Sequence, residues 1–325
     1  MTQIAMNADS IHAVGKTILL SIFSMTLLMK KRSFSRKMNF GKKKNIVLAG
    51  LLVAFMLIAA ACSTSEPSTT NGSTTSGPTN QTANATLKHV PTGTSDVKWD
   101  ATSKTLTVTV WLSGLAPKST HPQHIHKGDC NSDGAVVYTL NPIVADGTGV
   151  GTSETTIADV ANGIPQSGWY LNVHNGPGLS PDLQATPIAC ANIANPNAST
   201  GSNQSVHLTL GATSAASQGA SGSAQLAVVN NQLTVKVTLS GLVPNSTHIA
   251  HIHSGSCEAQ GAVKYPLNPI VADGQGNGTS ITTVDQVTTI PSSGWYVNVH
   301  LGGTKDELST QTGDDPIACG NVVLS

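Results

Sequence analysis

The chain has 325 residues, of which 39% are hydrophobic, 10% charged and 4% aromatic, and this length favours two domains. The formal net charge of zero hides an uneven distribution, because the part after Ala61 carries eight Lys, no Arg and 16 acids, a net charge of −8. Phosphate binding needs a basic face, so this composition argues against nucleic acid as a partner.

The N-terminal part of the chain predicts export. Three Lys at 42–44 precede the apolar run IVLAGLLVAFMLIAAA, which spans 46–61 and is followed by Cys62. A basic region, an apolar region shorter than the roughly 20 residues of a membrane span, and small residues before a cleavage point are typical of a signal peptide. The alternative is an uncleaved membrane anchor. We expect 1–37 to be an upstream extension, with translation starting at Met38 and a signal peptide at 38–61.

The ending Ala59-Ala60-Ala61-Cys62 resembles the lipobox of bacterial lipoproteins. The resemblance implies that Cys62 is diacylated and becomes the new N-terminus, so that the exported protein is anchored to the outer face of the cell membrane. Residues 62–84 are rich in Ser and Thr and cannot bury enough apolar surface to offset their conformational entropy. We expect this stretch to be a flexible linker.

The rest of the chain is a tandem repeat. The segment that begins at Thr120 recurs at Thr247. LNPIVADG occurs at 140 and again at 267, and PIAC occurs at 187 and again at 316. An offset of about 127 residues is too long for a solenoid unit and suits a self-sufficient domain. We therefore expect one domain at 85–197 and a second at 204–325, called the first and second copy below.

Each copy predicts β structure. Apolar residues alternate with Thr in the first copy at Leu106, Val108 and Val110, and the second copy repeats the pattern. This period of two is typical of half-buried strands, and neither copy shows a capped helical stripe. The fold class is therefore all-β, a sandwich or barrel in each copy. We expect the core to contain Val, Ile, Leu and Ala packed around Trp111, Trp169 and Trp295.

Eight of the ten His after Cys62 fall into two matching sets. In a strand, residues i and i+2 lie on one face roughly 7 Å apart, so His124 and His126 can meet at one point while Ile125 faces the core. His174 ends another alternating strand and can approach them; the second copy offers His251, His253 and His300. Three neutral imidazoles suit copper or zinc, and the lack of a thiolate or carboxylate motif favours copper.

The alternative is that these imidazoles are ordinary surface or hydrogen-bonding residues of a β module. His121 and His248 lie three positions before His124 and His251, on the opposite face of a strand, and we expect them to be structural.

Four cysteines remain if Cys62 carries lipid: Cys130 and Cys190 in the first copy, Cys257 and Cys319 in the second. They allow three pairings, of which one disulfide within each copy is the simplest in an exported protein. Thiolate metal ligands fit an oxidising compartment poorly.

The order Ser113-Gly114-Leu115, His121-x-x-His124-x-His126, Cys130, Asn172-Val173-His174 and Ala189-Cys190 resembles the copper/zinc superoxide dismutase domain, and the second copy repeats it. The resemblance implies a Greek-key β-barrel. It also implies one mononuclear copper per barrel, structural roles for His121 and His248, and disulfides Cys130–Cys190 and Cys257–Cys319. The implied copper ligands are His124, His126 and His174, and in the second copy His251, His253 and His300.

Two features depart from that family. Residues 134–147 and 261–274 contain no His where the family carries its bridging and zinc-binding His, so no zinc site is expected. Pro187 and Pro316 stand near the position where the family has an Arg that attracts superoxide. Without that cation, a chain of negative charge repels an anionic substrate, and we expect slow dismutation or none.

The chain also resembles the CHRD domain of exported proteins, through HIHKG at 124–128, GAVVYTL at 134–140 and YLNVH at 170–174. That resemblance implies an extracellular module without a catalytic role, binding protein or polysaccharide. The sequence thus predicts a surface-anchored copper-binding protein whose partners are the membrane and copper ions or small oxygen species. A non-enzymatic CHRD-type module is the alternative, and the sequence leaves catalysis and the oligomeric state open.

Overall fold

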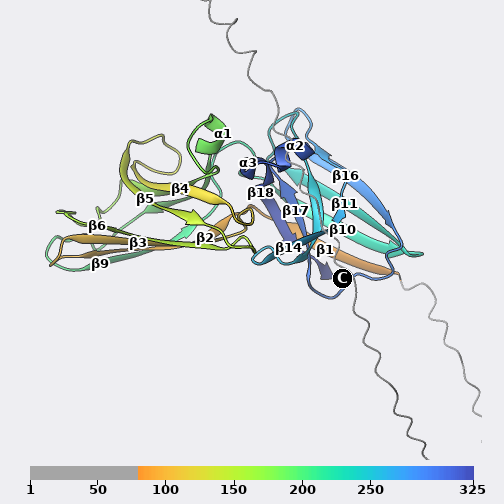
Figure 1. Ribbon diagram of the computed structural model, residues 1–325, viewed down its shortest axis with the longest axis horizontal. Coiled ribbons are helices and arrows are strands. Elements are labelled where there is room, and N and C mark those ends of the chain that lie inside the picture. The colour runs from red at the N-terminus through yellow and green to blue at the C-terminus, as the bar shows by residue number, and fades with distance from the viewer. Residues whose placement is uncertain (1–79) are drawn as a thin grey trace, which may run out of the picture. The chain divides into compact units, whose positions relative to one another are not determined.

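The structure, a computed structural model, describes residues 80–325. The predicted upstream extension, signal peptide and lipidation site at Cys62 lie outside the described residues. The described part is all-β as predicted. It forms two sandwiches, one for each copy of the repeat, and each is made of two separate sheets rather than a closed barrel (Figure 1). None of the helices in residues 80–325 has the length and hydropathy to cross a bilayer.

The first sandwich contains a sheet with the strand order β6-β3-β2-β9 and a sheet with the order β5-β4-β7-β8. Its elements are β2 Thr92–Asp100, β3 Thr105–Ser113, β4 Thr120–Lys127, β5 Val136–Val144, β6 Gly151–Ile157, β7 Trp169–His174, α1 Asp182–Ala185, β8 Pro187–Ile193 and β9 Gln204–Leu210.

The second sandwich contains the sheets β16-β11-β10-β1-β19 and β14-β13-β17-β18, and a short pair β12-β15. Its elements are β1 Gln81–Leu87, β10 Ser221–Val229, β11 Gln232–Ser240, β12 Thr247–His248, β13 Ala250–Gly255, β14 Gln260–Pro266, β15 Ile270–Val271, β16 Gly278–Asp285, β17 Trp295–His300, α2 Lys305–Leu308, α3 Gln311–Asp314, β18 Pro316–Asn321 and β19 Val323–Leu324.

The two sandwiches exchange their first strands. β1 lies at the start of the first copy, yet it pairs antiparallel with β10 in the second sandwich, from Gln81 opposite Val228 to Leu87 opposite Gly222. β9 opens the second copy and pairs in the same way with β2 in the first sandwich. In Figure 1 the orange strand β1 accordingly lies beside β10, apart from β2 and β3. Neither sandwich is therefore built from one copy alone.

β1 begins inside the stretch 62–84 that we predicted to be linker. Its burial alternates along the strand, with Ala83, Ala85 and Leu87 almost fully buried and polar residues exposed between them. Because the buried positions include small Ala residues, the composition of the segment is that of a polar linker. The sequence therefore did not predict a strand here, whose partner is more than 130 residues away.

Each exchanged strand is also fixed at the point where the chain leaves it. Lys88 forms two backbone hydrogen bonds with Cys319 of β18, and Gly211 forms two with Cys190 of β8, at N–O distances of 2.9–3.2 Å. Both half-cystines belong to the pairing predicted within each copy, and the disulfides Cys130–Cys190 and Cys257–Cys319 are present. The exchanged strands thus end against the disulfide-bearing sheets.

The core of each sandwich is aliphatic, and Leu106, Val108 and Val110 are 0–1% exposed as their alternation predicts. The expectation that Trp111 is a core residue is wrong, since its side chain is 41% exposed. Trp111 lies on the outer face of β3, in phase with the Thr residues. Trp99 of β2 takes the buried position in the first sandwich, and its indole N–H donates to the carbonyl of Val160 at 2.7 Å.

Candidate metal sites

Three histidines of the first sandwich meet where β4 and β7 pair. His124 and His126 lie on one face of β4, and Ile125 between them is fully buried in the core. His174 ends β7, where the register of β7 against β8 shifts by a residue. One ring nitrogen from each of the three lies within 4.8 Å of the others, and Nδ1 of His124 is 3.1 Å from Nε2 of His174. We call this group the first triad.

Backbone carbonyls fix the orientation of two of these rings. Nδ1 of His126 donates to the carbonyl of Gly134 at 2.9 Å, and Nδ1 of His174 donates to the carbonyl of Ala185 at 2.6 Å. Each bond places the proton on Nδ1 and leaves a lone pair on Nε2. Nε2 of His126 is buried and has no hydrogen-bond partner among the described residues. Metal-ligating histidines show this arrangement, with the second ring nitrogen bonded to a carbonyl or carboxylate.

Glycine is required at one of these carbonyls. A Cβ atom on Gly134 would lie 1.5 Å from the carbonyl oxygen of Lys127, so only glycine lets this chain segment approach β4. The ring of His126 also stacks on Tyr170, with the two ring centroids 5.0 Å apart. The Tyr170 hydroxyl donates to the carbonyl of Ser132 at 2.8 Å, two residues before Gly134. The orientation of His126 therefore depends on packing and on a supported loop.

The second sandwich repeats this geometry with His251, His253 and His300, the second triad. Their ligand atoms also lie within 4.8 Å, and Nδ1 of His251 is 3.2 Å from Nε2 of His300. His253 donates to the carbonyl of Gly261 at 3.0 Å, and its Nε2 is buried without a partner among the described residues. His300 donates to the carbonyl of Asp314 at 2.6 Å.

Burial lowers the pKa of five triad histidines, His124, His174, His251, His253 and His300. It lowers the pKa of His124 and of His251 to about 4, and the neighbouring imidazoles of each triad add to this effect. Burial likewise lowers the pKa of His300 to about 4, although the hydrogen bond to Asp314 opposes the shift. At neutral pH these rings are uncharged, and each has one unprotonated nitrogen, as metal binding requires.

His121 and His248 do not join the triads. Nδ1 of His121 donates to the backbone carbonyl of His174 at 2.9 Å, and Nε2 lies 2.7 Å from the hydroxyl of Ser119. His248 bonds in the same way to the carbonyl of His300 at 3.0 Å. Each of these histidines therefore donates a hydrogen bond to the backbone carbonyl of a triad member.

The two triads differ in the helix that precedes the last half-cystine. In the first sandwich the carbonyl that accepts from His174 belongs to Ala185, which has no charge. In the second it belongs to Asp314, whose carboxylate Oδ1 is also 3.6 Å from Nδ1 of His300. The sequence reasoning missed this acid. Aligning QATPIAC at 184–190 with GDDPIAC at 313–319 would have found it, because the two copies differ just before the repeated PIAC.

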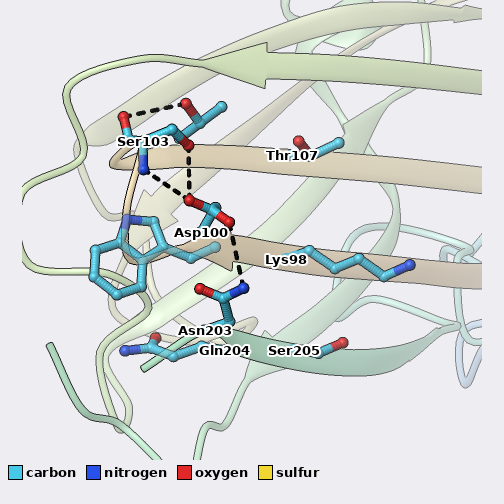
Figure 2. Close-up of a pocket in the computed structure, with 9 residues that line it drawn as sticks. Lys98, Asp100, Ser103, Thr107, Asn203, Gln204 and Ser205 are labelled. Atoms are coloured by element: carbon cyan, nitrogen blue, oxygen red, sulfur yellow. Dashed lines mark hydrogen bonds between the residues drawn. The ribbon is translucent and has the colours of Figure 1, made fainter. Parts of the chain in front are cut away.

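A polar pocket lies elsewhere, at the β2–β3 turn of the first sandwich. It is lined by Lys98, Asp100, Ser103, Asn203 and neighbouring residues, and it contains no triad histidine (Figure 2). The carboxylate of Asp100 accepts from the backbone N–H and hydroxyl of Ser103 at 2.7 and 3.0 Å and from the amide of Asn203 at 3.3 Å. The Asp100 carboxylate therefore stabilises the β2–β3 turn through these hydrogen bonds.

Comparison with known families matches residues 67–177 and 198–306, more than half of the chain, to the CHRD domain. The chain belongs to the CHRD family. Each CHRD match includes one exchanged strand, β1 in the first and β9 in the second, so each sandwich takes its first strand from the other CHRD repeat. Comparison with curated proteins finds no match. The CHRD assignment accounts for the tandem repeat, whereas the dismutase resemblance and the lipoprotein signal stay predictions.

Proposed function

We propose that this tandem CHRD protein is a non-enzymatic extracellular module in which each sandwich binds one copper ion. The observation that carries the proposal is the buried, unpartnered Nε2 of His126 and of His253, each aimed at two further imidazoles within 4.8 Å. A buried polar atom without a partner costs about 1–3 kcal/mol, and a metal ion at this point would supply the partner that this Nε2 lacks among the described residues.

The donor set favours copper over harder cations. The first triad presents three neutral imidazoles, and the four cysteines of the described residues are held in disulfides rather than available as thiolates. Imidazole suits copper and zinc, and copper(II) has the higher affinity for a given nitrogen site. The residues that would hold copper are His124, His126 and His174 in one sandwich and His251, His253 and His300 in the other. A bound copper ion would supply one-electron chemistry.

The location proposed for this module is the outer face of the cell membrane, with lipid on Cys62 as the anchor. The two disulfides support an oxidising compartment. Binding rather than dismutation is proposed because the sequence lacks Arg after residue 36 and has a net charge of −8 after Ala61, which disfavours an anionic substrate.

The family assignment favours a second candidate, a module that binds protein or polysaccharide. The polar pocket at the β2–β3 turn offers a place for a hydroxyl-rich ligand, because Lys98, Asn203 and Ser205 are exposed at its edge. In this reading the triad histidines need no metal.

Metal content decides between the two candidates. The full chain, supplied with copper and zinc and then dialysed, is expected to retain about two copper ions, and the His251→Ala, His253→Ala variant about one. A folded chain that retains no copper after dialysis would overturn the copper proposal and leave the binding module. A polysaccharide-binding assay with Asn203→Ala and Ser205→Ala would then follow.

A further inference from the structure

Residues Gln311 to Asp315 of the second copy, the 311–315 segment below, contact the first sandwich beside its triad. Nε2 of Gln311 donates to the carbonyls of Thr120 and Asn175 at 2.8 and 2.9 Å, and its Oε1 accepts from the N–H of Thr120 at 2.9 Å. Thr120 precedes His121, and Asn175 follows the triad member His174. A single side chain thus links the first residue of β4 to the residue that follows β7, beside the first triad.

Asp315 makes a second contact at the same place. Its carboxylate Oδ1 accepts from the N–H of Ala116 at 3.1 Å and lies 3.9 Å from Nε2 of His121. The side chain is 4% exposed, and burial raises the pKa of this carboxyl well above its ordinary value. His121 in turn donates a hydrogen bond to the carbonyl of His174. The 311–315 segment therefore lies next to the histidine that positions a member of the first triad.

The same segment also supports the second triad. Nδ1 of His300 donates to the carbonyl of Asp314 at 2.6 Å, with the Asp314 carboxylate 3.6 Å away. The segment forms one helical turn, in which the N–H of Asp315 donates to the carbonyl of Gln311 at 3.0 Å. A single helical turn therefore separates the contact beside the first triad from the contact with His300.

A further link runs beside His253. Gln260 is adjacent to Gly261, whose carbonyl orients His253, and Nε2 of Gln260 donates to the carbonyl of Leu115 in the first sandwich at 2.7 Å. Both carbonyls that orient second-triad rings thus lie next to residues bonded to the first sandwich.

We propose that Gln311 is a positioning residue through which the two triads are coupled, so that metal binding at the second triad raises the metal affinity of the first. This inference rests on the proposed copper binding. A cation on Nε2 of His300 polarises the ring, which strengthens the hydrogen bond from Nδ1 to Asp314 and the attraction to its carboxylate. The 311–315 segment is then held more firmly, and with it Thr120 and Asn175. The first triad loses less conformational freedom when it binds metal.

The direct test compares copper affinity at the first triad with and without a functional second triad. Titration of copper(II) against a competing chelator, with the electron paramagnetic resonance spectrum as a second readout, is applied to the full chain and to the His251→Ala, His253→Ala variant. We expect the first triad to bind at least about five-fold more weakly in the variant, the lower end of typical coupling. Because coupling is reciprocal, His124→Ala, His126→Ala should weaken the second triad by the same factor.

Gln311→Ala tests the route. In the intact chain it is expected to weaken the first triad by a similar factor and to make the two binding steps independent, although it removes no ligand. The matched control is Gln275→Ala, because Gln275 is an exposed Gln of the second copy that forms no side-chain hydrogen bond among the described residues. If the double His variant fails to fold, the comparison of the intact chain with Gln311→Ala still measures the coupling.

Each failure has its own signature. A first triad that binds copper with the same affinity in the wild-type chain, the His251→Ala, His253→Ala variant and Gln311→Ala would overturn the coupling and leave the proposed function standing. A Gln311→Ala chain that melts at a lower temperature but keeps the affinity and spectrum of the first site would show a structural role only, and would also overturn it. Absence of copper binding in the wild-type chain refutes the proposed function itself.

Discussion

Lys88 and Cys319 form two backbone hydrogen bonds with each other, at 2.9 and 3.0 Å, although 230 residues of chain lie between them. Lys88 follows the exchanged strand β1, and Cys319 carries the disulfide of the second sandwich. The stability of the second sandwich therefore depends on residues that precede the first.

The exchange predicts where damage from a core substitution appears. Leu87 of β1 and Leu210 of β9 are 1% and 0% exposed, so Leu→Ala at either should cost about 2–5 kcal/mol of unfolding free energy. Hydrogen exchange should show the loss of protection at β10 and β11 for Leu87→Ala, and at β2 and β3 for Leu210→Ala. The reverse pattern would contradict the exchange.

The support of His126 predicts an effect on the first metal site. Tyr170→Phe removes the hydroxyl that anchors the loop leading to Gly134, and we expect roughly ten-fold weaker copper binding at the first triad, as is typical for loss of a supporting bond. The measurement is chelator competition in the His251→Ala, His253→Ala background. Tyr138→Phe is the control, because that ring packs against Trp169 instead; an equal effect of both variants would contradict the role of Tyr170.

Buried imidazoles predict acid sensitivity of the metal-free protein. Burial lowers the pKa of His121 and of His300 to about 4 from 6.5, so between these values the unfolded chain binds more protons than the folded one. The free energy of unfolding should therefore fall as pH drops from 6.5 to 4. Urea unfolding in the presence of a chelator measures this, and His121→Asn should flatten the dependence. A denaturation midpoint that does not change with pH would count against it.

Charge predicts how salt affects any residual dismutation. With a net charge of −8 after Ala61 and no Arg in that part of the chain, superoxide is repelled from the protein. Screening weakens this repulsion, so the rate of superoxide removal by the copper-loaded chain should rise with ionic strength. Pulse radiolysis at low and high salt measures the sign. A rate that falls with added salt would reveal an attractive path for the anion.

The sequence was sufficient for the fold class and for the grouping of the histidines. Alternation along β4 places His124 and His126 on one face, and the repeat singles out His174 because it recurs as His300 at the end of the matching strand. Trp111 could have been placed correctly from the same alternation, since it is in phase with the Thr residues. The metal role itself stays a prediction.

The exchange and the contact between the sandwiches could not be predicted. β1 and β9 both alternate small or aliphatic residues with polar ones, and each fits β2 or β10 equally well by pattern, so only the three-dimensional path of the chain distinguishes the pairings. Gln311 gave no signal either, because its partners are backbone groups of Thr120 and Asn175, which carry no mark in the sequence.

The path of β1 also determines how the protein responds to a mechanical load. Tension applied from the N-terminal side enters the described chain at β1, which lies between β10 and β19 in the second sandwich. The first sandwich is therefore not the first to bear the force, although it is nearer in sequence. For a protein held at its N-terminus, the hydrogen bonds between β1 and β10 in the second sandwich set the force at which the structure begins to unfold.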